Sequence, residues 1–152
     1  KMVNLLLEIQ EAHAVPENVY SYESRLPYFD SLINSPYIQP EESRRYQAIK
    51  ANMLIELGRE MEAVEILEKL VNPALQYDPL SIERSLAIAY LRLVERSNCI
   101  VNHAAESCIL PIQGLGIHTE TEGSRKAIEI YSSLLEKIPA ILSPGGCSIL
   151  HS

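Results

Sequence analysis

Apolar residues recur every three or four positions along much of this chain, the spacing typical of amphipathic helices. Between about Glu41 and Val71 they form two such runs, and Leu57-Gly58 interrupts the period between them. Glycine tolerates the positive φ that often follows a helix end, so we predict two helices joined at Gly58. The apolar positions are Tyr46, Ile49, Met53, Leu54 and Leu57, then Val64, Leu67 and Leu70.

Two further helical patterns follow, from about Ser81 to Val94 and from about Gly123 to Lys137. The first 40 residues are less regular, because prolines interrupt them, and we expect two short helices there. No segment of useful length alternates with the period of two that strands require. The pattern therefore predicts an all-α fold.

Composition narrows the class of protein. The chain has 152 residues, of which 47% are hydrophobic and 22% charged, as in one globular domain. Its net charge of −7 argues against a general nucleic-acid binder, because such affinity comes from lysine and arginine. No apolar run approaches the roughly 20 residues of a membrane helix, so we expect no membrane insertion. Three cysteines leave a cytoplasmic and an exported location equally open.

The helix pairs repeat along the chain. Ala51 aligns with Ala87, an offset of 36 residues (87 minus 51), close to the tetratricopeptide period of about 34. An alanine, a large residue four positions on and a later proline occur twice, as Ala63, Leu67, Pro73 and as Ala127, Tyr131, Pro139. This pattern resembles the tetratricopeptide repeat (TPR) family over roughly residues 41–139. It departs at the aromatic position that opens each repeat, which is Gln47 and then Glu83.

The resemblance implies antiparallel helix pairs stacked in an α-α superhelix. Residues 1–139 would form one helical-repeat domain, with irregular helices at 1–40, a first repeat at 41–75 and a second at 80–139. A long loop insertion at 95–123 would split the second repeat, and 140–152 would be a tail. Two repeats and one irregular pair just reach the three units that such a stack needs, and a homodimer would extend it.

The insertion contains the stretch NCIVNHAAESCILPIQGLGIH, Asn98 to His118. It resembles a segment of bacterial, often exported, TPR proteins in which FG-GAP or ASPIC/UnbV regions follow the repeats. That resemblance implies the helical adaptor, or scaffold, part of a larger assembly.

Cysteine and histidine side chains gather in this insertion, in the spacing C-x3-H-x4-C-x9-H. Four such ligands suit a closed tetrahedral zinc site, although familiar zinc fingers space them differently. A disulfide between Cys99 and Cys108 is a second interpretation. A third is structural, with cysteines packed as small apolar groups and polar side chains bonding the loop's backbone. The candidate ligands are Cys99, His103, Cys108 and His118.

The same insertion offers a nucleophile and a base, Cys108 with His103 or His118, and Glu106 could orient an imidazole. No oxyanion-hole signature accompanies them, so we do not expect an enzyme.

If the helix pairs stack as the resemblance implies, the first helix of each pair lines a concave groove that binds an extended peptide or a partner helix. The repeat alignment places in it Arg45, Ala48, Asn52 and Glu56, and then Arg84, Ile88 and Arg92.

Arginines in an acidic chain favour a carboxylate ligand, which guanidinium binds through two hydrogen bonds. Asn52 resembles the asparagine of carboxylate-clamp members of the family, but Ala48 replaces the neighbouring lysine of that clamp. Alternatively, the arginines pair with Glu41, Glu42 or Glu56. We expect a non-catalytic protein-binding adaptor without a cofactor, the alternative being a zinc-binding or Cys/His catalytic module at residues 98–118.

Overall fold

The computed structural model describes residues 1–71, 79–101, 113–114 and 117–137. Within these ranges all regular structure is helical, which confirms the predicted all-α class. No described helix is long and apolar enough to cross a membrane. The helices are α1 (Met2–His13), α2 (Tyr22–Ile33), α3 (Pro40–Glu56), α4 (Glu60–Leu70), α5 (Pro79–Val101) and α6 (Glu122–Lys137).

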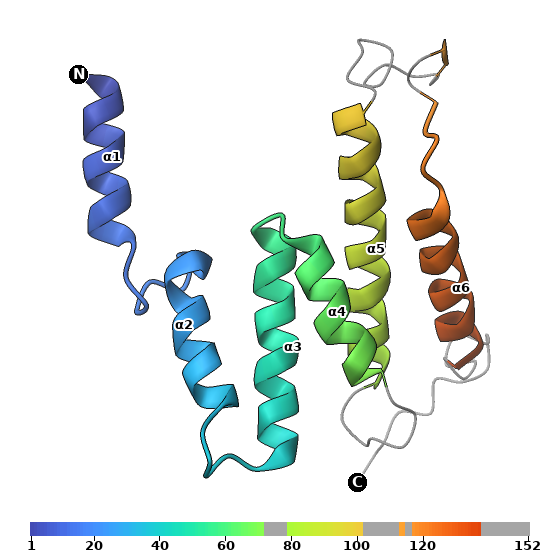
Figure 1. Ribbon diagram of the computed structural model, residues 1–152, viewed down its shortest axis with the longest axis horizontal. Coiled ribbons are helices and arrows are strands. Elements are labelled where there is room, and N and C mark those ends of the chain that lie inside the picture. The colour runs from blue at the N-terminus through green and yellow to red at the C-terminus, as the bar shows by residue number, and fades with distance from the viewer. Residues whose placement is uncertain (72–78, 102–112, 115–116, 138–152) are drawn as a thin grey trace, which may run out of the picture.

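The helices from α2 to α6 form an array in which each packs against the next, and α3 also packs against α5. Figure 1 shows their directions alternating along the array, so that α3 and α5 run the same way. α1 lies apart, beyond the start of α2, and takes part in none of the extensive interfaces between described helices.

The core runs along this array at the positions that the repeat pattern singles out. The four alanines at these positions have an exposed fraction of 1% or less, and two leucines of the core are equally buried. Alanine brings two helix axes close together because it has no side chain beyond Cβ, and the leucines fill the remaining space. The alanines are Ala51, Ala63, Ala87 and Ala127, and the leucines are Leu54 and Leu67.

The predicted break at Gly58 is confirmed. Gly58 has a φ of +72°, and its N–H donates to the carbonyl of Ile55 while the next N–H donates to that of Leu54. This pair of hydrogen bonds is the Schellman motif, which satisfies carbonyls that a helix end otherwise leaves unpaired. It reverses the chain within one short turn, so that α4 packs against α3.

Pro27 lies inside α2 rather than ending it. The ring removes one backbone hydrogen bond, but Pro27 is exposed and water can satisfy the freed carbonyl. Leu26 and Phe29 are buried, and the Phe29 ring meets the Tyr46 ring of α3 edge-on at a centroid distance of 5.9 Å. Packing against α3 therefore stabilises α2 despite the proline.

α5 ends at Val101, well beyond the predicted end near Val94, so the predicted insertion begins inside this helix. Asn98 explains the extension, because its side chain is buried and continues the packed face of α5 one turn past Val94. Its Oδ1 accepts the backbone N–H groups of Thr119 and Glu120, each at 3.0 Å. Its Nδ2 donates to the carbonyls of Glu120 and Val94, each at 2.8 Å.

The three bonds to Thr119 and Glu120 hold the segment that leads into α6 against α5. Gly123, in the first turn of α6, completes the attachment. A Cβ at this position would lie 2.6 Å from the Tyr90 carbonyl oxygen and 3.1 Å from Val94 Cβ, so only glycine fits without a shift. The start of α6 is thus fixed by one buried amide and one missing side chain.

Replacing Asn98 with alanine tests this attachment. Asn98→Ala leaves backbone groups of residues 119–120 without their side-chain partner, so we expect the free energy of unfolding to fall by about 1–3 kcal/mol in urea titrations. The amide protons of Thr119 and Glu120 should exchange with solvent much faster. Asn52→Ala is the matched control: that side chain is exposed and donates only within its own helix, so its effect should stay within about 0.5 kcal/mol. Equal effects of the two changes would contradict this assignment.

Candidate binding groove along α3 and α5

The four groove positions predicted on the first repeat follow one face of α3. Residues three or four apart lie on the same side of a helix. Arg45, Asn52 and Glu56 are exposed, whereas Ala48 is buried beneath them. The Asn52 Nδ2 donates to the Ala48 carbonyl at 3.0 Å, which leaves the amide oxygen of Asn52 pointing to no partner within the described residues.

The three positions predicted on the second repeat follow one face of α5 in the same way. Arg84 and Arg92 are exposed, and Ile88 is half-buried against the core. Because α3 and α5 pack against each other, the two predicted sets of residues lie on neighbouring helices.

Arg92 joins these two helices directly. Its Nη1 donates to the Ile55 carbonyl at 3.2 Å, and its Nη2 lies 3.6 Å from Glu56 Oε1. The Ile55 carbonyl is among those at the C-terminal end of α3, where the helix carries partial negative charge. The alternative interpretation, that an arginine pairs with Glu56, thus holds at Arg92.

The other two predicted arginines keep their charges available. Arg45 and Arg84 form no ion pair or hydrogen bond through their side chains within the described ranges. Arg84 precedes Arg92 by two turns of α5, roughly 12 Å along the axis. Two exposed arginines are therefore unpaired toward the N-terminal ends of α3 and α5, where α3 also carries Glu41 and Glu42, whereas Arg92 at the other end is paired.

A hollow of about 260 Å³ lies between α2 and α3. Asn52 and Glu56 line it, as does Tyr22, which sequence reasoning missed because the packing of α2 on α3 depends on contacts that no local pattern shows. The lining residues are Tyr22, Ile49, Asn52, Met53 and Glu56.

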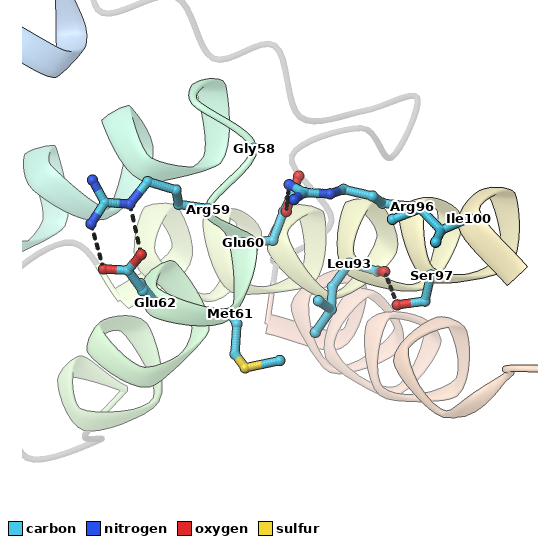
Figure 2. A pocket seen from close by; sticks show the side chains of 9 residues that line it. All are labelled: Gly58, Arg59, Glu60, Met61, Glu62, Leu93, Arg96, Ser97 and Ile100. Atoms are coloured by element: carbon cyan, nitrogen blue, oxygen red, sulfur yellow. Dashed lines mark hydrogen bonds and ion pairs between the residues drawn. The ribbon is translucent and has the colours of Figure 1, made fainter.

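A second hollow, of about 360 Å³, lies where the turn after α3 and the start of α4 meet α5 (Figure 2). Its charged side chains already have partners. Arg59 donates from Nε and Nη2 to the two carboxylate oxygens of Glu62, at 2.6 and 2.7 Å. Arg96 Nη1 lies 2.9 Å from Oε2 of the buried Glu60. We assign this hollow no ligand, because a charged ligand would have to displace these internal pairs.

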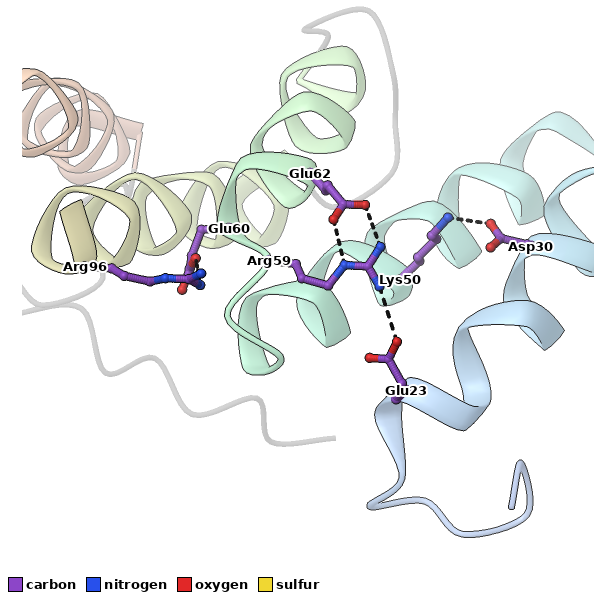
Figure 3. A network of polar contacts seen from close by, with 7 residues as sticks. All are labelled: Glu23, Asp30, Lys50, Arg59, Glu60, Glu62 and Arg96. Carbon is purple, nitrogen blue, oxygen red and sulfur yellow. Dashed lines mark hydrogen bonds and ion pairs between the residues drawn. The ribbon is translucent and has the colours of Figure 1, made fainter. Parts of the chain in front are cut away.

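The ion pairs around Arg59 connect three helices, as Figure 3 shows. The Nη1 atom of Arg59 also lies 3.6 Å from Oε1 of Glu23 on α2. Lys50 of α3 pairs with Asp30 of α2. The hydrogen bond from Arg59 lowers the pKa of the Glu62 carboxyl and raises that of the guanidinium. Both groups stay charged at neutral pH.

A third polar cluster joins α4, α5 and α6. The Tyr90 hydroxyl donates to Glu68, and Lys126 Nζ lies 4.8 Å from the centroid of the Tyr90 ring. Burial, and then the hydrogen bond to Glu68, raise the pKa of Tyr90, so the phenol is protonated at neutral pH. The cluster holds helices together and offers no activated nucleophile.

Only part of the predicted cysteine and histidine site lies within the described residues. Cys99 is a free, exposed thiol in the last turn of α5, and His118 is exposed ahead of α6. His103, Glu106 and Cys108 lie outside the described residues. Across the described ranges, no three His, Cys, Asp or Glu side chains are grouped to hold a metal ion. The zinc site, the Cys99–Cys108 disulfide and the catalytic pair stay predictions.

Comparison with known proteins found no match to this chain among family models, curated proteins or solved structures. The resemblance to TPR proteins therefore rests on the residue pattern alone.

Replacing Arg96 with alanine tests the ion pair at the second hollow. The change leaves the buried Glu60 carboxylate without its ionic partner, but the Arg96 side chain is about half exposed. We therefore expect a loss of about 1–2 kcal/mol in the free energy of unfolding, more than a surface pair contributes and less than a fully buried one. Glu60→Gln should remove most of the further effect of Arg96→Ala in a double-mutant cycle. Additive effects of the two changes would contradict the pairing.

Proposed function

We propose that this chain is a non-catalytic adaptor that binds a partner protein through an acidic peptide segment or helix lying along α3 and α5. The observation that carries the proposal is the pair of exposed arginines, Arg45 and Arg84, that have no ionic partner in the described part of this acidic chain. They lie on neighbouring helices, on faces that the repeat pattern predicts to line one groove.

The chemistry of the groove suits a carboxylate-bearing ligand. A guanidinium binds a carboxylate through two parallel hydrogen bonds, stronger than those between neutral groups. Ile88 offers an apolar contact between the arginines and the neutralised end at Arg92. The amide of Asn52 can accept a hydrogen bond from a ligand's backbone. An acidic side chain or C-terminus would bind at the arginines, with the rest of the segment running toward Asn52.

We propose a TPR-like superhelix as the scaffold of this groove. In that arrangement α3 with α4, and α5 with α6, are the two repeats, and α3 and α5 are their groove-facing helices. The alternating directions of α2 to α6 and the α3–α5 contact support it, as does the burial of the repeat alanines.

Reversing the charge of Arg84 tests the binding proposal. A random peptide library displayed on phage and selected on the immobilised protein should yield acidic peptides. Binding of a selected peptide should fall about 10-fold or more with Arg84→Glu, because each charge-assisted hydrogen bond contributes about 1.5–3 kcal/mol. Fluorescence anisotropy with the labelled peptide measures the loss.

Arg125→Glu is the matched control. Arg125 is also exposed and lies on α6, outside the groove. The same change of charge there should alter the affinity less than about twofold, since charges beyond a Debye length of roughly 10 Å are screened. Selection of peptides without acidic residues, or an equal loss for the two variants, would rule out the arginine groove.

A zinc-binding module is the second candidate, because Cys99 and His118 are both exposed at the ends of the insertion. Native mass spectrometry of protein purified without chelator would then show an excess equal to one metal ion, lost on acidification. Cys99→Ser with Cys108→Ser should abolish that excess and leave peptide binding intact. An unmodified mass would remove the zinc proposal without touching the groove.

A further inference from the structure

The hollow between α2 and α3 lies where the internal repeat predicts another helix. Its lining residues on α3 have counterparts on α5 at the repeat offset of 36. Ile49, Asn52, Met53 and Glu56 correspond to Ser85, Ile88, Ala89 and Arg92.

On α5 these counterparts are covered or in contact with a neighbour. Ser85 and Ala89 are buried, and Ile88 is half-buried against the core. Arg92 makes its hydrogen bond and its ion pair with α3, the helix two places earlier. On α3, Ile49 and Met53 are likewise packed against the core, whereas Asn52 and Glu56 are exposed and border an open hollow. A helix placed against α3 as α3 is placed against α5 would fill that hollow.

α1 has the composition of such a helix and lacks a partner. None of its residues is buried, and its large apolar side chains have exposed fractions between 47% and 73%. Met2, Leu5, Leu6 and Ile9 lie at helical spacing on one side, with Glu11 on the opposite side and Glu8 at the edge beside Leu5. Docking that apolar side leaves Glu11 in water, and Glu56 of the hollow is already paired with Arg92. A 12-residue helix is marginal alone in water, so α1 needs such a partner.

The segment between α1 and α2 directs α1 away from the α2–α3 hollow of the same chain. Asn18 Nδ2 donates to the His13 carbonyl at 3.0 Å, and Asn18 Oδ1 accepts the Tyr20 N–H at 3.1 Å. The Ser21 N–H donates to the Asn18 carbonyl at 2.9 Å. Figure 1 shows the result: α1 runs in the same direction as α2, beyond its N-terminal end, rather than folding back beside it. Folding back would break these bonds.

We infer that two copies of this chain exchange their α1 helices. The apolar side of each α1, carrying Met2, Leu5, Leu6 and Ile9, docks in the α2–α3 hollow of the other copy. Each copy presents both the helix and the hollow, which is the self-complementary arrangement of a two-fold dimer. The occupied hollow includes Asn52 and Glu56, so in the dimer a ligand of the proposed groove would be held by Arg45, Arg84 and Ile88 rather than by Asn52. The dimer does not depend on that groove's function.

Size-exclusion chromatography with light scattering tests the exchange on the whole chain. The wild type should have the mass of a dimer at micromolar concentration. Leu5→Glu with Leu6→Glu should give a monomer whose helices α2–α6 still unfold cooperatively, at a urea midpoint that no longer depends on protein concentration. Ile128→Glu with Leu135→Glu is the matched control, since both residues are exposed on α6 and the dimer should persist. A monomeric wild type, or a dimer that survives the α1 change, would overturn the inference.

Cysteine cross-linking places the helix. In a background with the three native cysteines changed to serine, one batch carries Leu6→Cys and another carries Asn52→Cys. Oxidising the mixture should give a disulfide-linked pair that contains one chain of each kind. A chain carrying both changes that instead cross-links to itself as a monomer would show that α1 folds back, which refutes the exchange. These readouts are independent of peptide binding, so the groove and the dimer can fail separately.

Discussion

Close approach of helices at alanine is the constraint on which the rest of this structure depends. Ala51 and Ala63 are buried in the first helix pair, and Ala87 and Ala127 in the second. A larger residue at any of them would push two helix axes apart and alter the next interface in turn, because each helix of the array packs on its predecessor. The proposed groove would depend on the same contacts, because α3 and α5 adjoin only while these contacts keep the two helices together.

The arginines at the two ends of the α3–α5 surface differ in whether they are paired. At the C-terminal end of α3, Arg92 is held by Glu56 and by a helix carbonyl, and around the α3–α4 turn Arg59 and Arg96 are each held by a glutamate. Near the N-terminal ends, Arg45 and Arg84 have no such partners within the described residues. The surface thus combines an end at which an arginine joins two helices with an end at which two exposed arginines are unpaired within the described residues.

Patterns within a short stretch of sequence predicted the features that depend only on neighbouring residues in the chain. The turn at Gly58 follows from one glycine after an amphipathic run, and the buried alanines follow from their spacing. The reach of α5 could not be predicted, because Asn98 is polar and is buried only through partners such as Glu120, far along the chain. Tyr22 was missed for a similar reason, since its place in the hollow depends on how α2 packs on α3. The groove residues were predicted as a set, but the capture of Arg92 by Glu56 needed both helices in place.

Because Asn98 binds the backbone of Thr119 and Glu120, the packing of α6 on α5 does not depend on the length of the segment that follows Val101. That segment returns at Thr119 and Glu120, whose backbone is bound one turn before the helix end it left. Both of its ends are therefore anchored on the same turn of the same helix. The entropy of closing a flexible loop grows slowly, by about 0.6 kcal/mol for each doubling of length. A protein domain, a tag or a sensor peptide could be inserted between these anchors while α5 and α6 keep their contact.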